Sequence, residues 1–194
     1  ETLRQPLEDR EVTVSRVEAT VTYPANFQLV AAMNPCPCGH FPDLARCRCT
    51  EGQITRYLQK ISGPLLDRID LCVEASPVTY GDVRGGGENE ASGAIRARVE
   101  QAREIQKERF MEENIRCNGE MAGRHIRKYC VLGKEEETFM EEIFEKLALS
   151  ARMHDRILKV ARTTADLAGE SKIRLSDLCE AVSYVKSREK FWGN

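Results

Sequence analysis

Four cysteines in one short loop are the residues whose type and spacing most directly suggest chemistry. They form two Cys-x-Cys pairs, Cys36 with Cys38 and Cys47 with Cys49. A structural Zn2+ takes four tetrahedral ligands, commonly thiolates, and two close pairs joined by a loop can surround it. The gap within each pair is one residue rather than the usual two, so four loop thiols without a metal are the alternative. We expect a structural Zn2+ site, with iron as the alternative metal and His40 as a weaker substitute ligand.

An Asn-Pro dipeptide stands directly before these cysteines. Residues 27–33, FQLVAAM, are almost all apolar and predict a strand that is buried on both faces. Proline has no backbone N–H, so this strand should end at Asn34-Pro35. Asn34 would then lie at the carboxyl end of a buried strand, where open α/β sheets place ligand chemistry. A simple turn-forming asparagine is the alternative.

Two arginines, Arg68 and Arg152, are further candidate residues. Arg68 is the last residue of a short predicted helix, residues 65–68, and precedes a predicted strand, residues 69–74. A salt bridge to a neighbouring aspartate is the simpler explanation for it. Arg152 lies in the first turn of a predicted helix over residues 150–168. The helix dipole disfavours a cation there, but an anion opposite the side chain would reverse that preference.

Alternating β-branched residues predict a β-hairpin over residues 12–23, with Arg16 near its tip. A solvated arginine is the ordinary explanation for such a position. Beyond a glycine-containing segment the apolar spacing becomes helical. We therefore expect a mixed α/β fold made of three parts: an α/β region over 1–78, a linker over 79–93 and an all-α bundle over 94–194. The other helices are predicted over residues 1–10, 51–60, 91–111, 122–129 and 135–147, with a last one capped by Ser176.

Composition limits the classes of function. The chain has 194 residues and a formal net charge of -2, so bulk charge suggests neither nucleic acid nor an anionic membrane as a partner. No apolar run approaches the roughly 18 residues of a membrane span, and no signal peptide is recognisable. We expect a cytoplasmic protein with reduced thiols and no membrane partner. The phosphate-binding pattern G-x-x-x-x-G-K-[ST] is absent from the sequence, so this chain alone should bind nucleotide weakly or not at all.

Five stretches together resemble the magnesium-chelatase-related AAA+ ATPases of the ComM/YifB type. They are LRQPLEDREVTVSR, YPANFQLVAAMNPCPCG, CRCT, ISGPLLDRIDLCVE and LSARMHDRILKVARTTADLAG. The resemblance runs nearly from end to end, and the cysteine loop after MNP is specific to that group. In such proteins a Lon-like domain and both Walker motifs precede the matching region. The resemblance thus implies a C-terminal fragment, namely the last part of an AAA+ α/β core followed by a helical lid.

The resemblance also implies roles for single residues. Asn34 matches the sensor-1 asparagine, which orients the water that attacks the γ-phosphate. Arg68 matches the arginine finger, which reaches the nucleotide of a neighbouring subunit. Arg152 matches the sensor-2 arginine of the lid, with Arg156 and Arg162 as weaker candidates for that nucleotide contact.

The hairpin around Arg16 resembles the pre-sensor-1 hairpin that contacts DNA in related hexameric helicases. The full-length protein is accordingly expected to bind ATP and Mg2+ and to assemble into a ring, as a hexamer. The function implied is ATP hydrolysis coupled to DNA remodelling or branch migration, with this fragment alone inactive. A chelatase-type ATPase that remodels a protein and a zinc-bearing interaction module are the alternatives.

Overall fold

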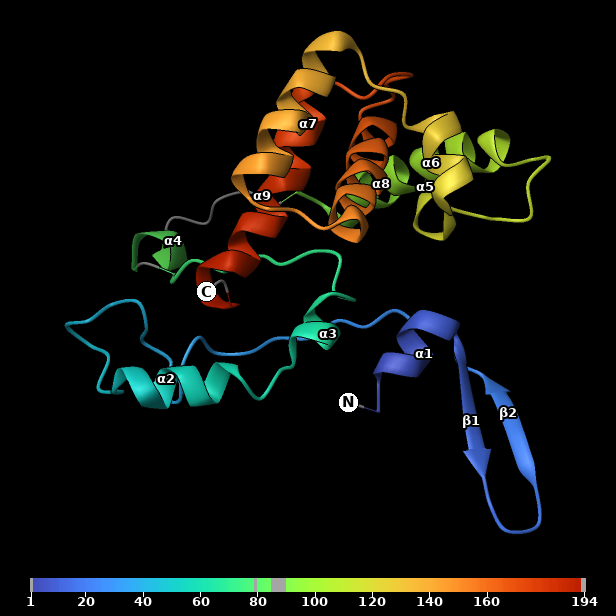
Figure 1. Ribbon diagram of the computed structural model, residues 1–194. Coiled ribbons are helices and arrows are strands. Elements are labelled where there is room, and N and C mark those ends of the chain that lie inside the picture. The colour runs from blue at the N-terminus through green and yellow to red at the C-terminus, as the bar shows by residue number, and fades with distance from the viewer. Residues whose placement is uncertain (1, 79, 85–89, 193–194) are drawn as a thin grey trace. The chain divides into compact units, whose positions relative to one another are not determined.

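A computed structural model describes residues 2–78, 80–84 and 90–192 (Figure 1). It divides into two compact units, Glu1–Leu71 with Arg188–Asn194, and Cys72–Ser187. The linker predicted over 79–93 falls partly outside the described residues, at 79 and 85–89; its remainder includes a short helix, α4 (Tyr80–Arg84). The mixed fold is thus mostly helical, with one small sheet in the part of the chain described.

The first unit begins with a short helix and a hairpin. Helix α1 (Arg4–Asp9) ends at Arg10, which has a left-handed backbone with φ of 59°. Strands β1 (Glu11–Ser15) and β2 (Thr20–Pro24) pair antiparallel, with Ser15 opposite Thr20. Facing hydroxyls add side-chain hydrogen bonds of 3.1 Å across this sheet. The predicted hairpin is confirmed.

Two capped helices follow in the first unit. Helix α2 (Glu51–Leu58) begins after Thr50, whose hydroxyl accepts the backbone N–H of Gln53 while the Gln53 side chain accepts the N–H of Thr50. This reciprocal cap satisfies two N–H groups that a helix start otherwise leaves without partners. Helix α3 (Gly63–Leu66) begins after Ser62, with proline at its second position, slightly earlier than predicted.

The end of helix α9 (Leu175–Trp192) also belongs to the first unit. There the Trp192 indole Nε1–H donates to the Leu58 carbonyl at 3.1 Å, and Arg188 pairs with Asp67 at 3.0 Å. These contacts join residues more than one hundred positions apart in sequence. They fix the last helical turn against the end of α2 and the residue after α3.

Two predicted strands do not form. Residues 27–33 and 69–74 have no regular secondary structure and are assigned to no sheet. Phe27, Val30 and Met33 are 44%, 84% and 40% exposed, so the run predicted to be buried on both faces is not buried. The physical reason is that a central strand needs a hydrogen-bonded neighbour. Within the described residues, β1 and β2 pair only with each other.

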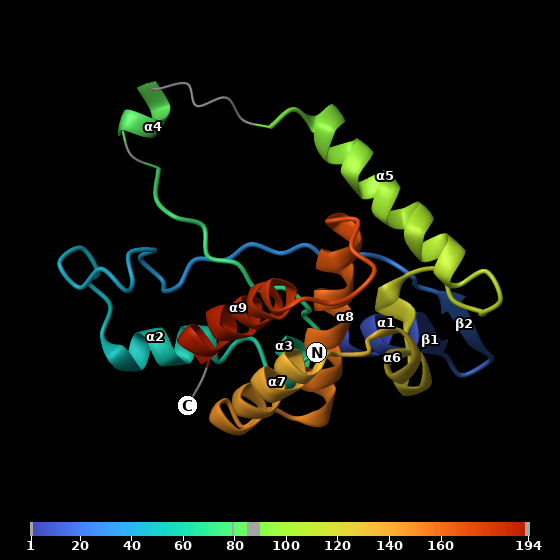
Figure 2. The ribbon, with the colours of Figure 1, turned by 90° about the horizontal axis from the view of Figure 1, so that it is seen from above.

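The second unit is a helical bundle with its own core. Figure 2 shows its helices from another side. Helix α8 (Ala151–Leu167) supplies much of that core because Ile157, Ala161 and Ala165, spaced by four residues, are almost fully buried. Ser150 caps this helix as predicted, by accepting the Met153 backbone N–H at 3.2 Å. The remaining elements are α5 (Ser92–Arg109), η1 (Asn118–Glu120), α6 (Gly123–Tyr129), α7 (Lys134–Lys146), α8 (Ala151–Leu167) and most of α9.

The predicted cap at Ser176 is wrong. Helix α9 begins at Leu175, two residues before the start that a cap at Ser176 implies, and Asp177 in its first turn bonds the backbone of the residue before the helix. Its carboxylate accepts the backbone N–H of Arg174 at 2.8 Å, so the acceptor lies inside the first turn and reaches backwards.

In the part of the chain that is described, no helix has both the length and the apolar character needed to cross a bilayer.

A buried carboxylate ties α5, η1 and α8 together. Asp166, with an almost fully buried side chain, accepts hydrogen bonds from Arg109 (2.7 Å for the longer bond), from Arg162 at 3.0 Å and from Asn118 at 2.8 Å. Asn118 also donates to the Thr163 hydroxyl at 3.0 Å. Because two cations share one anion here, removal of that anion would leave buried positive charge without compensation.

We therefore expect Asp166→Ala to lower the free energy of unfolding of the second unit by about 3–5 kcal/mol. The effect should appear as a lower urea midpoint, followed by the helical circular dichroism signal. Asp155→Ala, on the same helix but half exposed beside His154, serves as the control and should change stability by less than about 0.5 kcal/mol. Equal midpoints for both variants would show that the network does not stabilise the bundle.

Candidate functional site

The loop that carries the four cysteines is built from tight turns. Gly39 adopts a left-handed backbone with φ of +81°, and its N–H donates to the Cys36 carbonyl at 3.1 Å. The Asp43 carboxylate accepts the backbone N–H groups of Ala45 and Arg46 at 3.0 and 3.3 Å, which shapes the segment between the two pairs. Helix α2 begins immediately after the second pair. These turns bring the two cysteine pairs together, although the loop has no hydrophobic core of its own.

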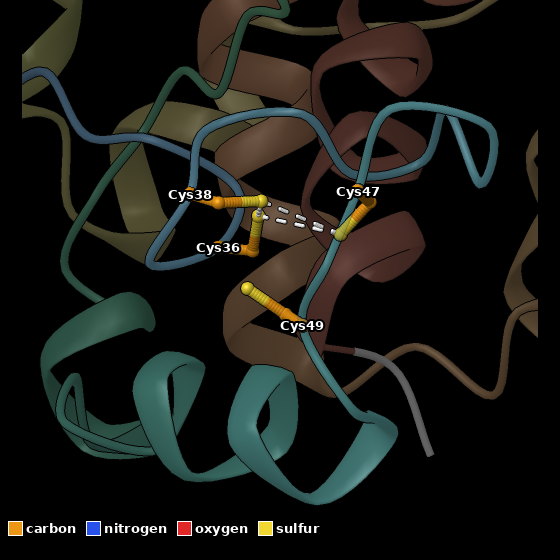
Figure 3. Close-up of side chains that lie close together, drawn as sticks. All are labelled: Cys36, Cys38, Cys47 and Cys49. Atoms are coloured by element: carbon orange, nitrogen blue, oxygen red, sulfur yellow. Dashed lines mark hydrogen bonds between the residues drawn. The ribbon is translucent and has the colours of Figure 1, made fainter.

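The four sulfur atoms converge (Figure 3). The Cys36 Sγ lies 3.4 Å from the Cys38 Sγ and 3.8 Å from the Cys47 Sγ, and the Cys38 and Cys47 sulfurs are 3.6 Å apart. Together with Cys49, all four sulfurs lie within 4.8 Å of one another. A tetrahedral zinc with Zn–S bonds of about 2.3 Å requires sulfurs separated by roughly 3.8 Å.

The surroundings of the sulfurs differ from one another. Backbone N–H groups of His40 and Arg48 lower the pKa of Cys38 to about 6. Burial acts to raise the pKa of Cys36, yet the Phe41 N–H, 3.4 Å from its sulfur, turns the net shift downwards. Desolvation raises the pKa of Cys49 to about 12. Backbone N–H groups directed at thiolate sulfurs are the kind of outer contact that supports a metal–thiolate site.

These four cysteines are therefore close enough to hold one metal ion, and their donor set fits a soft, tetrahedral cation. Four thiolates fill a tetrahedral coordination sphere, so such an ion would be structural rather than catalytic. His40 is exposed and is not part of the group of converging ligand atoms. Among the described residues, this is the one cluster of at least three potential ligands that converge in this way.

Asn34 lies two residues before this cluster and is exposed. Its carboxamide lies against Gly39, because a Cβ placed on Gly39 would be 3.7 Å from the Asn34 Cγ. The predicted setting, at the end of a strand in a sheet, is not formed, since residues 27–33 are unpaired. The structure thus places Asn34 beside Gly39 of the cysteine loop, whereas the strand prediction placed it at the edge of a sheet.

Arg68 follows α3 and is mostly buried, with 15% of its side chain exposed. One guanidinium nitrogen forms an ion pair with Glu8 and another donates to the Pro64 carbonyl. Its Nε is buried without a hydrogen-bond partner. The alternative of a salt bridge to a neighbouring aspartate does not describe these contacts. Glu8 lies sixty residues before Arg68, and no sequence pattern predicts their pairing.

The three candidates for the sensor-2 position occupy different environments on α8. Arg152 is exposed in the first turn, and Arg156, one turn later, is half-buried. Arg162 is 2% exposed; besides Asp166, it donates to the backbone carbonyls of Ser171 and Glu170 at 2.9 and 2.5 Å. A guanidinium held in this way is part of the bundle and is not available to a phosphate.

Arg16 lies at the tip of the β1–β2 hairpin. Its backbone N–H and carbonyl pair with Ala19 at 2.9 and 3.3 Å, which closes a two-residue turn through Val17 and Glu18. The Arg16 side chain is exposed, as is Val17 beside it. An exposed cation at the end of a two-stranded ribbon can contact an anionic surface without any rearrangement of the hairpin.

Comparison with known proteins defines the class. Residues 1–83 match the family described as magnesium chelatase, subunit ChlI, and residues 89–185 match the family described as its C-terminal part. The chain belongs to the magnesium chelatase ChlI family, in agreement with the resemblance of its motifs.

Particular relatives narrow this assignment. The chain is similar to "Competence protein ComM" of Haemophilus influenzae, with 44% identity over 183 residues. It is 43% and 42% identical to "Uncharacterized protein YifB" of Salmonella typhimurium and of Escherichia coli, respectively. Each match covers 94% of this chain and 35% of the relative, so the chain spans about a third of the length of these proteins.

We expect the chain to bind one Zn2+, and Cys49→Ser to weaken that binding at least tenfold because a neutral hydroxyl replaces a thiolate ligand. The measurement is metal content after gel filtration, together with competition against a chromophoric chelator. Cys179→Ser, at an exposed cysteine of the other unit, is the control and should leave both values unchanged. Zinc retained equally by both variants would contradict a four-thiolate site.

The affinity for Zn2+ should fall as the pH falls. Metal binding requires thiolates, so protons compete with the metal at every cysteine. The decline should steepen below about pH 6, where Cys38 becomes protonated, while Cys49 gives up its proton on binding throughout the neutral range. Chelator competition across the range from about pH 5 to pH 8 measures this. A pH-independent affinity would rule out thiolate ligation.

Proposed function

We propose that this chain is the part of a magnesium-chelatase-type AAA+ ATPase that supplies nucleotide-sensing residues and a trans-acting arginine. The observation that carries the proposal is the family match, which extends over nearly all of the chain. The sequence lacks a phosphate-binding glycine loop, so ATP and Mg2+ would be held by other parts of the longer protein.

The chemistry of phosphoryl transfer is consistent with the roles proposed for these residues. This reaction needs donors aimed at the charge that develops on the phosphoryl oxygens and a polar group that orients the attacking water. We assign the water-orienting role to Asn34 and the donor roles to Arg68 and, on the lid, Arg152, with Arg156 as the alternative lid contact. Assembly into a ring, a hexamer in our proposal, would bring Arg68 to the nucleotide of the neighbouring subunit.

Two segments that belong to no sheet among the described residues, 27–33 and 69–74, support an origin in a larger sheet. Residues 27–33 and 69–74 present apolar side chains to solvent, and a monomer gains nothing from that exposure. We propose that both segments pair with strands supplied by other residues of the longer protein. Asn34 would then follow directly on a central strand, as the sequence pattern indicates.

Within this class we favour remodelling of DNA over remodelling of a protein. The relative named as a competence protein and the exposed Arg16 at a hairpin tip support DNA, and branch migration is the activity that the resemblance implies. The family's description as a magnesium chelatase subunit supports the alternative, a motor that acts on a partner protein. The two differ in whether branched DNA stimulates ATP hydrolysis.

In the full-length protein, we expect Arg68→Ala to lower kcat for ATP hydrolysis by at least about 10³-fold, the usual contribution of an arginine finger. The exposed Arg56→Ala on α2 is the matched control and should retain normal turnover. The measurement is phosphate release at saturating ATP, with and without branched DNA. Normal turnover by the Arg68 variant would favour a zinc-bearing interaction module over a motor.

We expect Arg16→Ala to weaken binding of the full-length protein to DNA and to reduce the slope of log affinity against log salt by about 1 for each phosphate that the protein no longer neutralises. Fluorescence anisotropy with labelled branched DNA over a series of salt concentrations measures both values. Glu18→Ala in the same turn should not weaken binding. An unchanged slope and affinity for the arginine variant would remove the hairpin from the DNA-binding surface.

A further inference from the structure

The cysteine loop folds back onto Asn34. Gly39 lies five residues beyond this asparagine, and a Cβ at its position would stand 3.7, 3.8 and 4.0 Å from the Cγ, Nδ2 and Oδ1 atoms of Asn34. A methyl group at this position would therefore be in van der Waals contact with the whole carboxamide. Gly39 has φ of +81°, a conformation in which glycine is favoured because it carries no Cβ.

The position of Gly39 depends on the first cysteine pair. Its N–H bonds to the Cys36 carbonyl, and Cys38 precedes it directly, so both neighbours that fix this turn are members of the sulfur cluster. Cys36 is fully buried, and its sulfur also receives the Phe41 N–H. The first cysteine pair, Gly39 and Asn34 thus form one compact turn.

Sulfur atoms join this turn to the second cysteine pair. The Cys36 and Cys38 sulfurs contact the Cys47 sulfur at 3.8 and 3.6 Å, and thiols are weak hydrogen-bond donors and acceptors. A cation shared by four thiolates replaces these weak contacts with four strong bonds. Such a cation would hold the turn at one position relative to α2, which starts directly after the second pair.

We propose that the metal held by Cys36, Cys38, Cys47 and Cys49 is the positioning device of Asn34, and that Gly39 is the residue through which it acts. This inference rests on the proposed function for one point, the role of Asn34 in orienting water. The metal has no place in the reaction itself. It fixes a turn, the turn carries Gly39, and the space that Gly39 leaves open by lacking a Cβ adjoins the carboxamide of Asn34.

A metal that merely stabilised the loop would behave differently. It would raise the resistance of the first unit to unfolding but leave the side-chain amide of Asn34 with the same freedom as any exposed asparagine. The distinguishing readout is therefore that amide. It can be followed in the 194-residue chain, without ATP, by nitrogen-15 NMR, and Asn34→Asp identifies its signals by their disappearance.

The first experiment compares the chain loaded with Zn2+ and the chain stripped with a chelator. We expect the Asn34 side-chain amide to give two well-dispersed signals with zinc and to move to the position of a free asparagine without it. The side-chain amide of Asn118, which is buried and bonded to Asp166 in the other unit, is the internal control and should not move. Asn34 signals that are identical in both states would overturn the inference.

The second experiment uses a matched pair of substitutions in the full-length protein. Gly39→Ala leaves all four thiols in place but strains the turn and places a methyl group against Asn34. Gly52→Ala on α2 meets nothing within 4 Å and is the control. We expect the first variant to keep one Zn2+ and to lose at least about tenfold in kcat, with KM for ATP changed less than about twofold, because misplacing a reacting group by about 1 Å costs rate.

A Gly39 variant that retains zinc and full kcat would refute the positioning role. The result for Asn34 itself tests the proposed function separately. If the Asn34 amide responds to zinc but full-length Asn34→Ala hydrolyses ATP at the normal rate, the link between metal and Asn34 stands and the sensor role fails.

Discussion

Burial of apolar surface is divided very unevenly between the two units, and this constraint governs the rest of the structure. Helices α5 to α9 enclose a contiguous core, whereas in the described part of the first unit the buried side chains are Pro6, Cys36, Leu58 and Leu66. Apolar burial is the main term that offsets the loss of chain entropy on folding. A unit with so little of it depends on other stabilising interactions, and small folds commonly use a metal for that purpose.

The features of the first unit follow from that shortage. Helix caps, a two-stranded hairpin and the ion pair between Arg68 and Glu8 are local or exposed interactions of modest strength. A structural zinc contributes on the order of 10 kcal/mol in small peptides, which exceeds all of them. Strands donated by other parts of a longer protein would supply the missing apolar burial. The bundle needs neither, since its core and the Asp166 network already lie within its own residues.

Sequence pattern predicted the helices well because their apolar spacing and caps are local. The bundle helices appear within a few residues of their expected limits, and the sulfur cluster is visible in the spacing of the cysteines. The strand over residues 27–33 failed because pairing depends on a neighbour that no local pattern supplies. The sequence pattern also did not predict the contacts between distant residues, Glu8 with Arg68 and Arg109 with Asp166. Gly39 had a signal, an isolated glycine inside a cysteine loop, but its contact with Asn34 needed coordinates.

The hydrogen bond between Trp192 and Leu58 has a practical consequence. Trp192 is the only tryptophan of the chain, and its indole N–H donates to a carbonyl of the unit that contains the four cysteines. Its fluorescence therefore responds to any change that breaks the contact between the end of α9 and the end of α2. The protein thus carries its own optical probe, placed where the last turn of the polypeptide meets the end of α2.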